Sequence, residues 1–311
     1  MASSITVAQL RAQVSPVLSK LCPLAEAHKS QLDLYYLSNN CNPMALDYIL
    51  RNPKVCHMSC VMFGLSRNPV AIAFLETHKD LIIPAWMFQN PNLSKDLFDI
   101  VLKEKPTAYY YAYLYSNPSD VVVDYMLKRP EKIEWYYFSK NTNEKAVACL
   151  KKNKEKINWS CLSGNTSNGA IHLLKENRER IDVDQLSLNS NPKAFELLLT
   201  FPDDCINYIN LSANTNPKAV DHLIKNRPDE INWCLFSKNP TAMPYLVANP
   251  EKVHFQTLWE NPAIFQIDEQ AVCKERSDAI KKQLLSIFMD PDRVDRLREK
   301  GISFKEIVDN L

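Results

Sequence analysis

Apolar and polar residues recur along most of the chain in blocks of about 24 residues. One part of each block reads Ile, a polar residue, an aromatic or apolar residue, two variable positions, Leu or Phe, Ser, any residue, Asn. Four copies are Ile133–Asn141, Ile157–Asn165, Ile181–Asn189 and Ile231–Asn239. The final asparagine of this nine-residue pattern marks a repeat with a mean period of about 24.6 residues. We call these residues the boundary asparagines: Asn40, Asn68, Asn90, Asn117, Asn141, Asn165, Asn189, Asn214, Asn239 and Asn261.

The second part of each block predicts a helix that begins at Asn-Pro-x-Ala. Proline suits the first helical position, and the asparagine before it suits the N-cap. After Asn216-Pro217, the apolar residues Ala219, Val220, Leu223 and Ile224 fall on one helical face. We therefore expect asparagines to act as helix caps; the residues in question are Asn117, Asn191, Asn216, Asn239 and Asn261.

The nine-residue pattern predicts a second, shorter helix. It starts at a polar cap such as Asn158, Asp182 or Asn232 and carries its large side chains into the core. It ends at Ser-x-Asn, where we expect the asparagine to adopt the left-handed conformation that terminates helices. The expected core residues of these helices are Trp135, Trp159, Trp233, Leu162, Leu186 and Leu235.

Neither helix is long enough to be stable alone, so neighbouring pairs have to stack. The pattern predicts an all-α fold, a right-handed α-solenoid of about ten helix-turn-helix repeats of 24–25 residues, its handedness taken from other helical solenoids. Residues 1–37 form an N-terminal helical cap, residues 38–263 the solenoid and residues 264–311 a C-terminal helical cap. A leucine-rich repeat is the alternative at this period, but only Leu186–Asn189 reads as its strand.

The two repeat motifs resemble those of repeat proteins that giant DNA viruses of amoebae encode in many copies. The resemblance covers about residues 38–300 and includes the ending Pro262–Phe265 with the later Asp290–Val294. It is weaker at Thr107–Tyr115 and Val55–Met62, where the tryptophan is lost. The resemblance implies a viral origin and a helical repeat fold, and it supplies no catalytic residues.

Composition narrows the classes of function. The formal net charge is +1, and the chain has 4 glycines, so neither a strong field for nucleic acid nor a glycine-rich phosphate loop is expected. Nine cysteines without paired spacing indicate reduced thiols in a cytosolic compartment. No apolar stretch has the length of a signal peptide or a membrane span. We expect a cytoplasmic protein, in the host cytoplasm, the viral factory or the virion.

Candidate chemistry is sparse. Cys56-His57-x-x-Cys60 is the tightest group of metal-capable residues, but no second pair lies near it, which favours a structural turn over zinc. The six histidines lie singly in different repeats, and His254 stands at a short-helix cap. We therefore expect no catalytic residue, no metal and no cofactor.

Two clusters remain as candidates for binding. The tyrosine run favours core packing, with partner contact and base stacking as alternatives; its members are Tyr109, Tyr110, Tyr111, Tyr113 and Tyr115. The basic cluster of Lys151, Lys152, Lys154 and Lys156 reads as solvated charge near a helix end.

The sequence favours a non-enzymatic scaffold for protein–protein interaction, because solenoids present a long rigid surface. The expected partner is a host or viral protein, and the protein itself is expected to be a monomer without membrane contact. An RNA-binding helical repeat is the alternative; the low net charge and the irregular residues after each tryptophan disfavour it. An enzyme with an unrecognised site is a third, weaker hypothesis.

Overall fold

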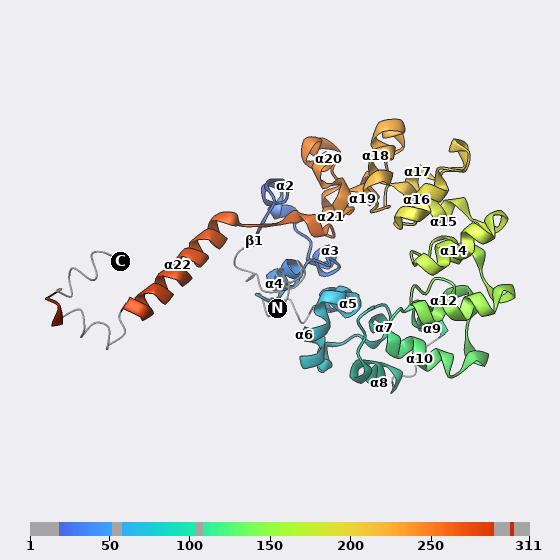
Figure 1. Ribbon diagram of the computed structural model, residues 1–311, viewed down its shortest axis with the longest axis horizontal. Helices are drawn as coiled ribbons and strands as arrows, with labels where there is room; N and C mark the ends of the chain where they lie inside the picture. The colour runs from blue at the N-terminus through green and yellow to red at the C-terminus, as the bar shows by residue number, and fades with distance from the viewer. Residues whose placement is uncertain (1–18, 52–57, 104–107, 289–298, 302–311) are drawn as a thin grey trace. The chain divides into compact units, whose positions relative to one another are not determined.

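A computed structural model describes residues 19–51, 58–103, 108–288 and 299–301, and the regular secondary structure of these residues is almost entirely helical (Figure 1). The only strands in these ranges are β1 (Ser19–Leu21) and β2 (Phe265–Ile267), which form a two-stranded sheet. The expectation of an all-α protein is confirmed.

Two kinds of helix alternate through most of the chain; we call them the short and the longer helices after the prediction, although α5 and α9 of the first kind have nine residues each and α6 and α20 of the second kind have six. The short helices that contain the nine-residue pattern are α3 (Leu34–Ser38), α5 (Ser59–Arg67), α7 (Pro84–Met87), α9 (Ala108–Ser116), α11 (Trp135–Phe138), α13 (Trp159–Ser163), α15 (Val183–Leu188), α17 (Tyr208–Leu211), α19 (Trp233–Ser237) and α21 (Phe255–Leu258). The helices that follow them are α4 (Pro43–Leu50), α6 (Ile72–Thr77), α8 (Lys95–Lys103), α10 (Asp120–Leu127), α12 (Glu144–Lys152), α14 (Asn168–Glu176), α16 (Pro192–Leu198), α18 (Pro217–Asn226) and α20 (Met243–Ala248). Helix α2 (Pro23–Ala27) precedes them, and α22 (Glu269–Phe288) comes after β2.

The chain divides into two compact units, one of residues 21–265 and one of residues 1–20 with 266–311. The second unit contains α22, whose first turn is held by the side chain of Asp268, which accepts a hydrogen bond from the Ala271 N–H. The division into two caps and a repeat region at residues 37 and 263 stays a prediction.

Asparagine–proline pairs begin α4, α16 and α18 as the sequence predicts, whereas α10, α12 and α14 begin at other polar caps. Asn191 and Asn216 are the N-caps of α16 and α18, and each side chain accepts the N–H two residues later. Asn239 and Asn261 cap short 3₁₀ turns in the same way. Asn117 is not a cap, because Ser119 occupies the N-cap of α10; Asn117 accepts the Ser119 N–H from outside the helix.

The short helices end without a left-handed residue, which corrects the expectation for the boundary asparagines. Asn189, Asn239 and Asn261 have φ of −73°, −80° and −74°. Each boundary N–H donates instead to the carbonyl three residues earlier, as Asn165 does to Leu162. The final turn is therefore tightened, and the chain continues in an extended conformation.

The core lies between the short and the longer helices. The sixth position of the nine-residue pattern is buried in all ten copies; its residues are Leu37, Leu65, Met87, Leu114, Phe138, Leu162, Leu186, Leu211, Phe236 and Leu258. Leu235 is only half-buried, since Phe236 and not Leu235 is at the sixth position.

The three tryptophans expected in the core are also only half-buried. Trp135, Trp159 and Trp233 pack against the core from its edge. A lysine from the following segment covers two of them: Lys156 Nζ is 4.8 Å from the Trp135 ring, and Lys252 Nζ is 5.2 Å from the Trp233 ring. In each of these cation–π contacts, one face of the tryptophan ring packs against the ammonium of an exposed lysine.

Helices of the same kind contact their successors. Among the short helices, α3 contacts α5, α5 contacts α7 and α13 contacts α15; among the longer ones, α12 contacts α14 and α14 contacts α16. In Figure 1 the helices follow one another in chain order from α3 to α21.

The ten boundary asparagines are joined by one repeated set of hydrogen bonds. Each buried side-chain NH₂ donates to two carbonyls of the preceding boundary: Asn165 donates to Ser139 and Asn141 at 3.1 and 2.8 Å, and Asn189 donates to Ser163 and Asn165 at 2.9 Å each. Each Oδ1 accepts the N–H two residues later, as Asn165 accepts that of Ser167. The same bonds link all ten residues in order. We call this set the asparagine ladder.

The asparagine ladder returns to its start. Asn40, in the first copy of the pattern, donates to the carbonyls of Trp259 and Asn261 in the last copy, at 2.8 and 2.9 Å. Asn42 donates to the carbonyl of Pro262, and Trp259 Nε1 donates to that of Gln31. Residues more than 200 positions apart in sequence therefore make the same contacts as neighbouring copies do.

Candidate interaction face

A row of aromatic side chains crosses the short helices α3, α5, α7, α9 and α11. The residues occupy the fourth or fifth position of the nine-residue pattern, and we call them the aromatic face: Tyr35, Phe63, Trp86, Tyr113, Tyr136 and Tyr137. Neighbouring rings contact one another, with centroid separations of 6.2 Å for Tyr35–Phe63, 3.9 Å for Phe63–Trp86 and 5.8 Å for Trp86–Tyr113. Tyr136 and Tyr137 form an edge-to-face pair at 5.0 Å.

Exposure increases along this row. Tyr35, Phe63, Trp86 and Tyr113 are half-buried, whereas Tyr136 is 51% exposed. Tyr137 is also exposed. The first four rings support one another, and the two tyrosines of α11 place large amphipathic side chains in solvent. Exposed tyrosines are typical anchors of protein interfaces.

Cations stand beside the rings at the eighth position of the pattern. The Arg67 guanidinium lies 5.5 Å from the Phe63 ring and 5.9 Å from the Trp86 ring. Lys140 Nζ lies 5.7 Å from the Tyr136 ring. The aromatic face therefore combines apolar area with positive charge.

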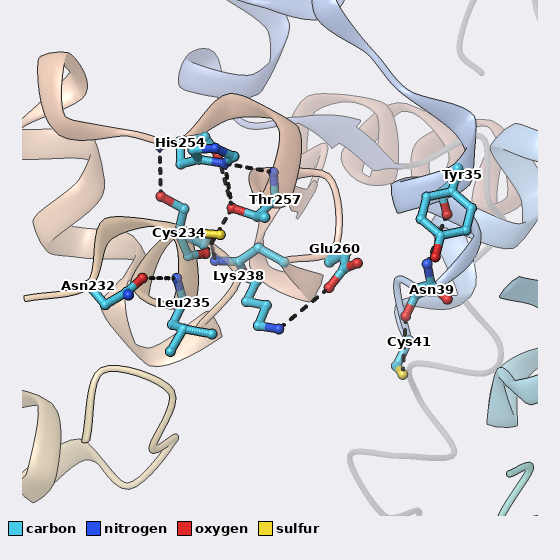
Figure 2. A network of polar contacts seen from close by, with 12 residues as sticks. Tyr35, Asn39, Cys41, Asn232, Cys234, Leu235, Lys238, His254, Thr257 and Glu260 are labelled. Carbon is cyan, nitrogen blue, oxygen red and sulfur yellow. Dashed lines mark hydrogen bonds and ion pairs between the residues drawn. The ribbon is translucent and has the colours of Figure 1, made fainter. Parts of the chain in front are cut away.

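Polar side chains lie beyond Arg67, at the junction between the first and last copies of the nine-residue pattern. Arg67 Nε donates to Asn39 Oδ1 at 2.7 Å. On the other side, Lys238 and Glu260 pair at 4.0 Å. Figure 2 shows Lys238 pointing toward Glu260, with Tyr35 and Asn39 on the neighbouring segment.

Electrostatics at this junction depend on burial. Desolvation raises the pKa of the Glu260 carboxyl, and the charges of Lys238 and Arg67 oppose that shift. The carboxyl is mostly enclosed, with 22% of its side chain exposed. The surroundings of Glu260 therefore stabilise its ionised form only weakly.

The short helices from α13 to α21 present a different, more polar face. Ser160 donates to Asp182 at 2.5 Å, and Asn207 donates to Asp184 at 3.0 Å. His254 caps α21 by accepting the Thr257 N–H, and the Thr257 hydroxyl donates to the Cys234 carbonyl (Figure 2). These bonds tie neighbouring short helices together and leave the aromatic face as the distinctive surface.

The tyrosine run that the sequence singles out is divided by the structure. Tyr113 belongs to the aromatic face, but Tyr115 is buried and donates from its hydroxyl to the Lys132 carbonyl at 2.5 Å. The side chains of Tyr109, Tyr110 and Tyr111 lie outside the described residues, as do Cys56 and His57. The lysine cluster divides as well, since Lys156 covers Trp135 and Lys154 pairs with Glu176 at 3.6 Å.

Sequence reasoning missed most of the aromatic face. It treats positions four and five of the pattern as variable, since no single residue type recurs there in all copies. Alignment of all copies by their boundary asparagine shows the signal, because an aromatic residue occupies at least one of these two positions in each of the first five copies.

In the part of the chain that the structure describes, no group of three or more His, Cys, Asp or Glu residues could hold a metal ion. No helix among the described residues has the length and apolarity to cross a membrane. Comparison of the chain with protein-family models, with curated proteins and with solved structures gives no significant match.

Proposed function

We propose that residues 32–261 form a helical-repeat solenoid whose last repeat returns to its first, and that this solenoid is a non-enzymatic scaffold for protein–protein interaction. The proposal for the solenoid is supported by the asparagine ladder, which makes the same bonds between Asn261 and Asn40 as between neighbouring repeats.

The observation that carries the proposed function is the exposure of Tyr136 and Tyr137 beside a continuous row of rings. Neither tyrosine is needed to complete the core, because Phe138 fills the buried position of α11. Exposed apolar residues also occur at other short helices, such as Leu188 and Ile209. Large solvent-exposed side chains on a rigid framework are what an interface needs.

Ring geometry disfavours the alternative of nucleic-acid binding. The contacting rings of Phe63, Trp86 and Tyr113 are tilted by 43° and 40° and leave no slot between parallel faces for a base. Phosphate binding also needs a basic stripe, and the net charge of the chain is +1. A protein partner fits the combination of packed rings and two cations better.

The resemblance to the repeat proteins of giant viruses supports the further proposal of a viral origin, with a host or viral partner in the cytoplasm or viral factory. The experiment is capture of partners by the tagged full chain from amoebae infected with such a virus, with and without nuclease. We expect a stoichiometric protein partner that survives nuclease and is lost with the Tyr136→Ser/Tyr137→Ser double variant.

A matched control is Val247→Ser, which removes an exposed apolar side chain from a longer helix. Circular dichroism and the melting temperature confirm that all variants fold. Capture that is unchanged in the tyrosine variant contradicts the aromatic face as the interface. Partners that disappear on nuclease treatment favour nucleic-acid binding instead.

A further inference from the structure

Charge is distributed unevenly over the short helices, and this asymmetry points to a class of partner. In α3, α5, α7, α9 and α11, positions four, five and eight of the pattern hold Arg67 and Lys140 and no Asp or Glu. From α13 to α21 the same positions hold the acids Asp184 and Glu260 and one lysine, Lys238. These positions therefore carry two positive charges on the aromatic half and a net charge of −1 on the other half.

The two cations are available to a ligand. Among the described residues, neither Arg67 nor Lys140 forms an ion pair; Glu260, whose pKa the charge of Arg67 lowers in part, pairs with Lys238 at 4.0 Å. Arg67 uses Nε to hold Asn39 and has its two terminal nitrogens left for a partner. Lys140 is exposed; its ammonium contacts the Tyr136 ring face, and its charge also acts on the Cys161 thiol.

Between the cations lies an unused amide. Gln89 occupies position eight of the copy that contains α7, two residues after the helix ends, and within the described residues its side-chain amide makes no hydrogen bond. A half-buried amide of this kind can donate to and accept from the backbone of an extended chain. The Trp86 ring lies three residues earlier, in α7, so a peptide that crosses this copy meets both an apolar ring and an amide.

We propose that the aromatic face, Arg67 and Lys140 together bind an extended acidic peptide segment of the partner. This inference rests on the scaffold function proposed above and names its ligand. One carboxylate of the peptide pairs with the Arg67 guanidinium and another with the Lys140 ammonium. Apolar or aromatic side chains between the two carboxylates pack on Trp86, Tyr113 and Tyr136.

Geometry sets the spacing of the two carboxylates. Arg67 and Lys140 occupy the same position three short helices apart, and packed helices are separated by roughly 9 Å, which gives a span of about 27 Å. An extended chain advances about 3.3 Å per residue, so the span corresponds to about eight residues. A folded helix of the same span needs about eighteen residues at 1.5 Å each, and its carboxylates have a different spacing.

The test is selection of peptides from a displayed library of random twelve-residue sequences with the full chain as bait. We expect enrichment of peptides that carry two Asp or Glu residues about eight positions apart, with aromatic or apolar residues between them. The strongest peptide is then synthesised with a fluorescent label, and its dissociation constant is measured by anisotropy. Substitution of either peptide carboxylate by its amide is expected to weaken binding about fivefold.

Lys140→Gln tests the protein side, and it is expected to weaken binding of the same peptide about fivefold. The peptide whose Lys140-paired carboxylate is replaced by its amide is expected to bind this variant as weakly as it binds the wild type, because the ion pair is already lost. Lys140 is exposed, so this variant folds even if Arg67→Gln does not. Lys151→Gln, at an exposed lysine of α12, is the matched control and is expected to leave binding unchanged.

Selected peptides without an excess of Asp or Glu overturn the proposal, as does a Lys140→Gln variant that binds as the wild type does. Absence of any enriched peptide also overturns it. If the tyrosine-dependent capture described above succeeds in that case, the scaffold function stands and its partner is a folded surface. A twelve-nucleotide single-stranded RNA is tested in the same assay. If it binds more tightly than the peptide and its binding depends on Lys140, the ligand of this face is nucleic acid and not an acidic peptide.

Discussion

At the scale of single residues, the boundary asparagines use every hydrogen-bonding group of a buried side-chain amide. Asn165 donates to two carbonyls and accepts one N–H, and it is 1% exposed. Such a side chain substitutes for the backbone bonds that the helix ends leave open. Asparagine suits the position because aspartate lacks the donors and glutamine is longer.

Replacement of a boundary asparagine is therefore expected to be costly. Asn165→Ala leaves two carbonyls and one N–H without partners in a buried place, which is expected to lower the free energy of unfolding by about 3 kcal/mol. Asn191→Ala removes a half-buried N-cap that accepts the Lys193 N–H and is expected to cost about 1 kcal/mol. Urea denaturation of both variants measures the difference, and equal losses contradict the role of the asparagine ladder.

Glu260 provides a prediction on pH dependence. Burial raises the pKa of its carboxyl, so the folded state holds the proton to a higher pH than the unfolded chain does. The folded state then binds more protons just above the ordinary pKa of Glu, and stability falls as the pH rises through that window. Glu260→Gln removes this loss. The variant is expected to melt at a higher temperature than the wild type at pH 7 and at a similar temperature at pH 4.

Glu251→Gln, at an exposed site, controls for removal of one negative charge. If Glu260→Gln has a lower melting temperature than the wild type at pH 7, the account is contradicted, because the ion pair with Lys238 then stabilises the protein by more than the burial of the carboxylate destabilises it.

At the scale of elements, the period and the apolar face of the longer helices were enough to predict their positions. Pro217 at the first position of α18 and Asn216 at its cap agree with the sequence expectation. The burial of Leu162 and Leu186 does so too. The end of the short helices could not be predicted in the same way, since a tightened last turn and a left-handed residue both place a polar residue after the helix.

Tryptophan burial was overestimated for a related reason. The periodic pattern shows which face of a helix is apolar, but it does not show whether the edge of that face is covered. Trp233 lies at this edge under Lys252, whereas Trp259 is fully buried and donates to the Gln31 carbonyl. Sequence reasoning had assigned Trp233, and not Trp259, to the core.

The two tryptophans are therefore expected to differ in their contribution to stability. Trp259→Ala is expected to cost about 4 kcal/mol, since it leaves a cavity and an unpaired carbonyl. Trp233→Ala is expected to cost about 2 kcal/mol, below the usual range for a fully buried aromatic residue. Chemical denaturation compares them, and a greater loss for Trp233→Ala contradicts the assigned burial.

Pro217→Ala tests the boundary of α18. Proline is favoured at the first helical position, but alanine is tolerated there, so a loss below about 1 kcal/mol is expected. The Asn216 cap accepts the Lys218 N–H, which this substitution leaves in place. A large loss of stability contradicts the helix start at Pro217.

At the scale of the larger unit, the central feature is the return of the asparagine ladder from Asn261 to Asn40. The repeat period could be read from the sequence, but the return could not. It depends on how the ten copies are placed relative to one another, which the sequence of a single copy does not show. The aromatic face was missed for the same reason, because it forms only when copies are placed side by side.

The most direct test of this account is hydrogen exchange of the asparagine side-chain amides, followed by NMR on the full chain labelled with ¹⁵N at asparagine. Asn40 donates to Trp259 and Asn261 only if the first and last repeats meet. We predict that its side-chain NH₂ exchanges as slowly as that of Asn165, far more slowly than that of the exposed Asn168. Exchange of Asn40 at the rate of Asn168, with Asn165 still protected, contradicts the account because it shows a ladder that ends at Asn40.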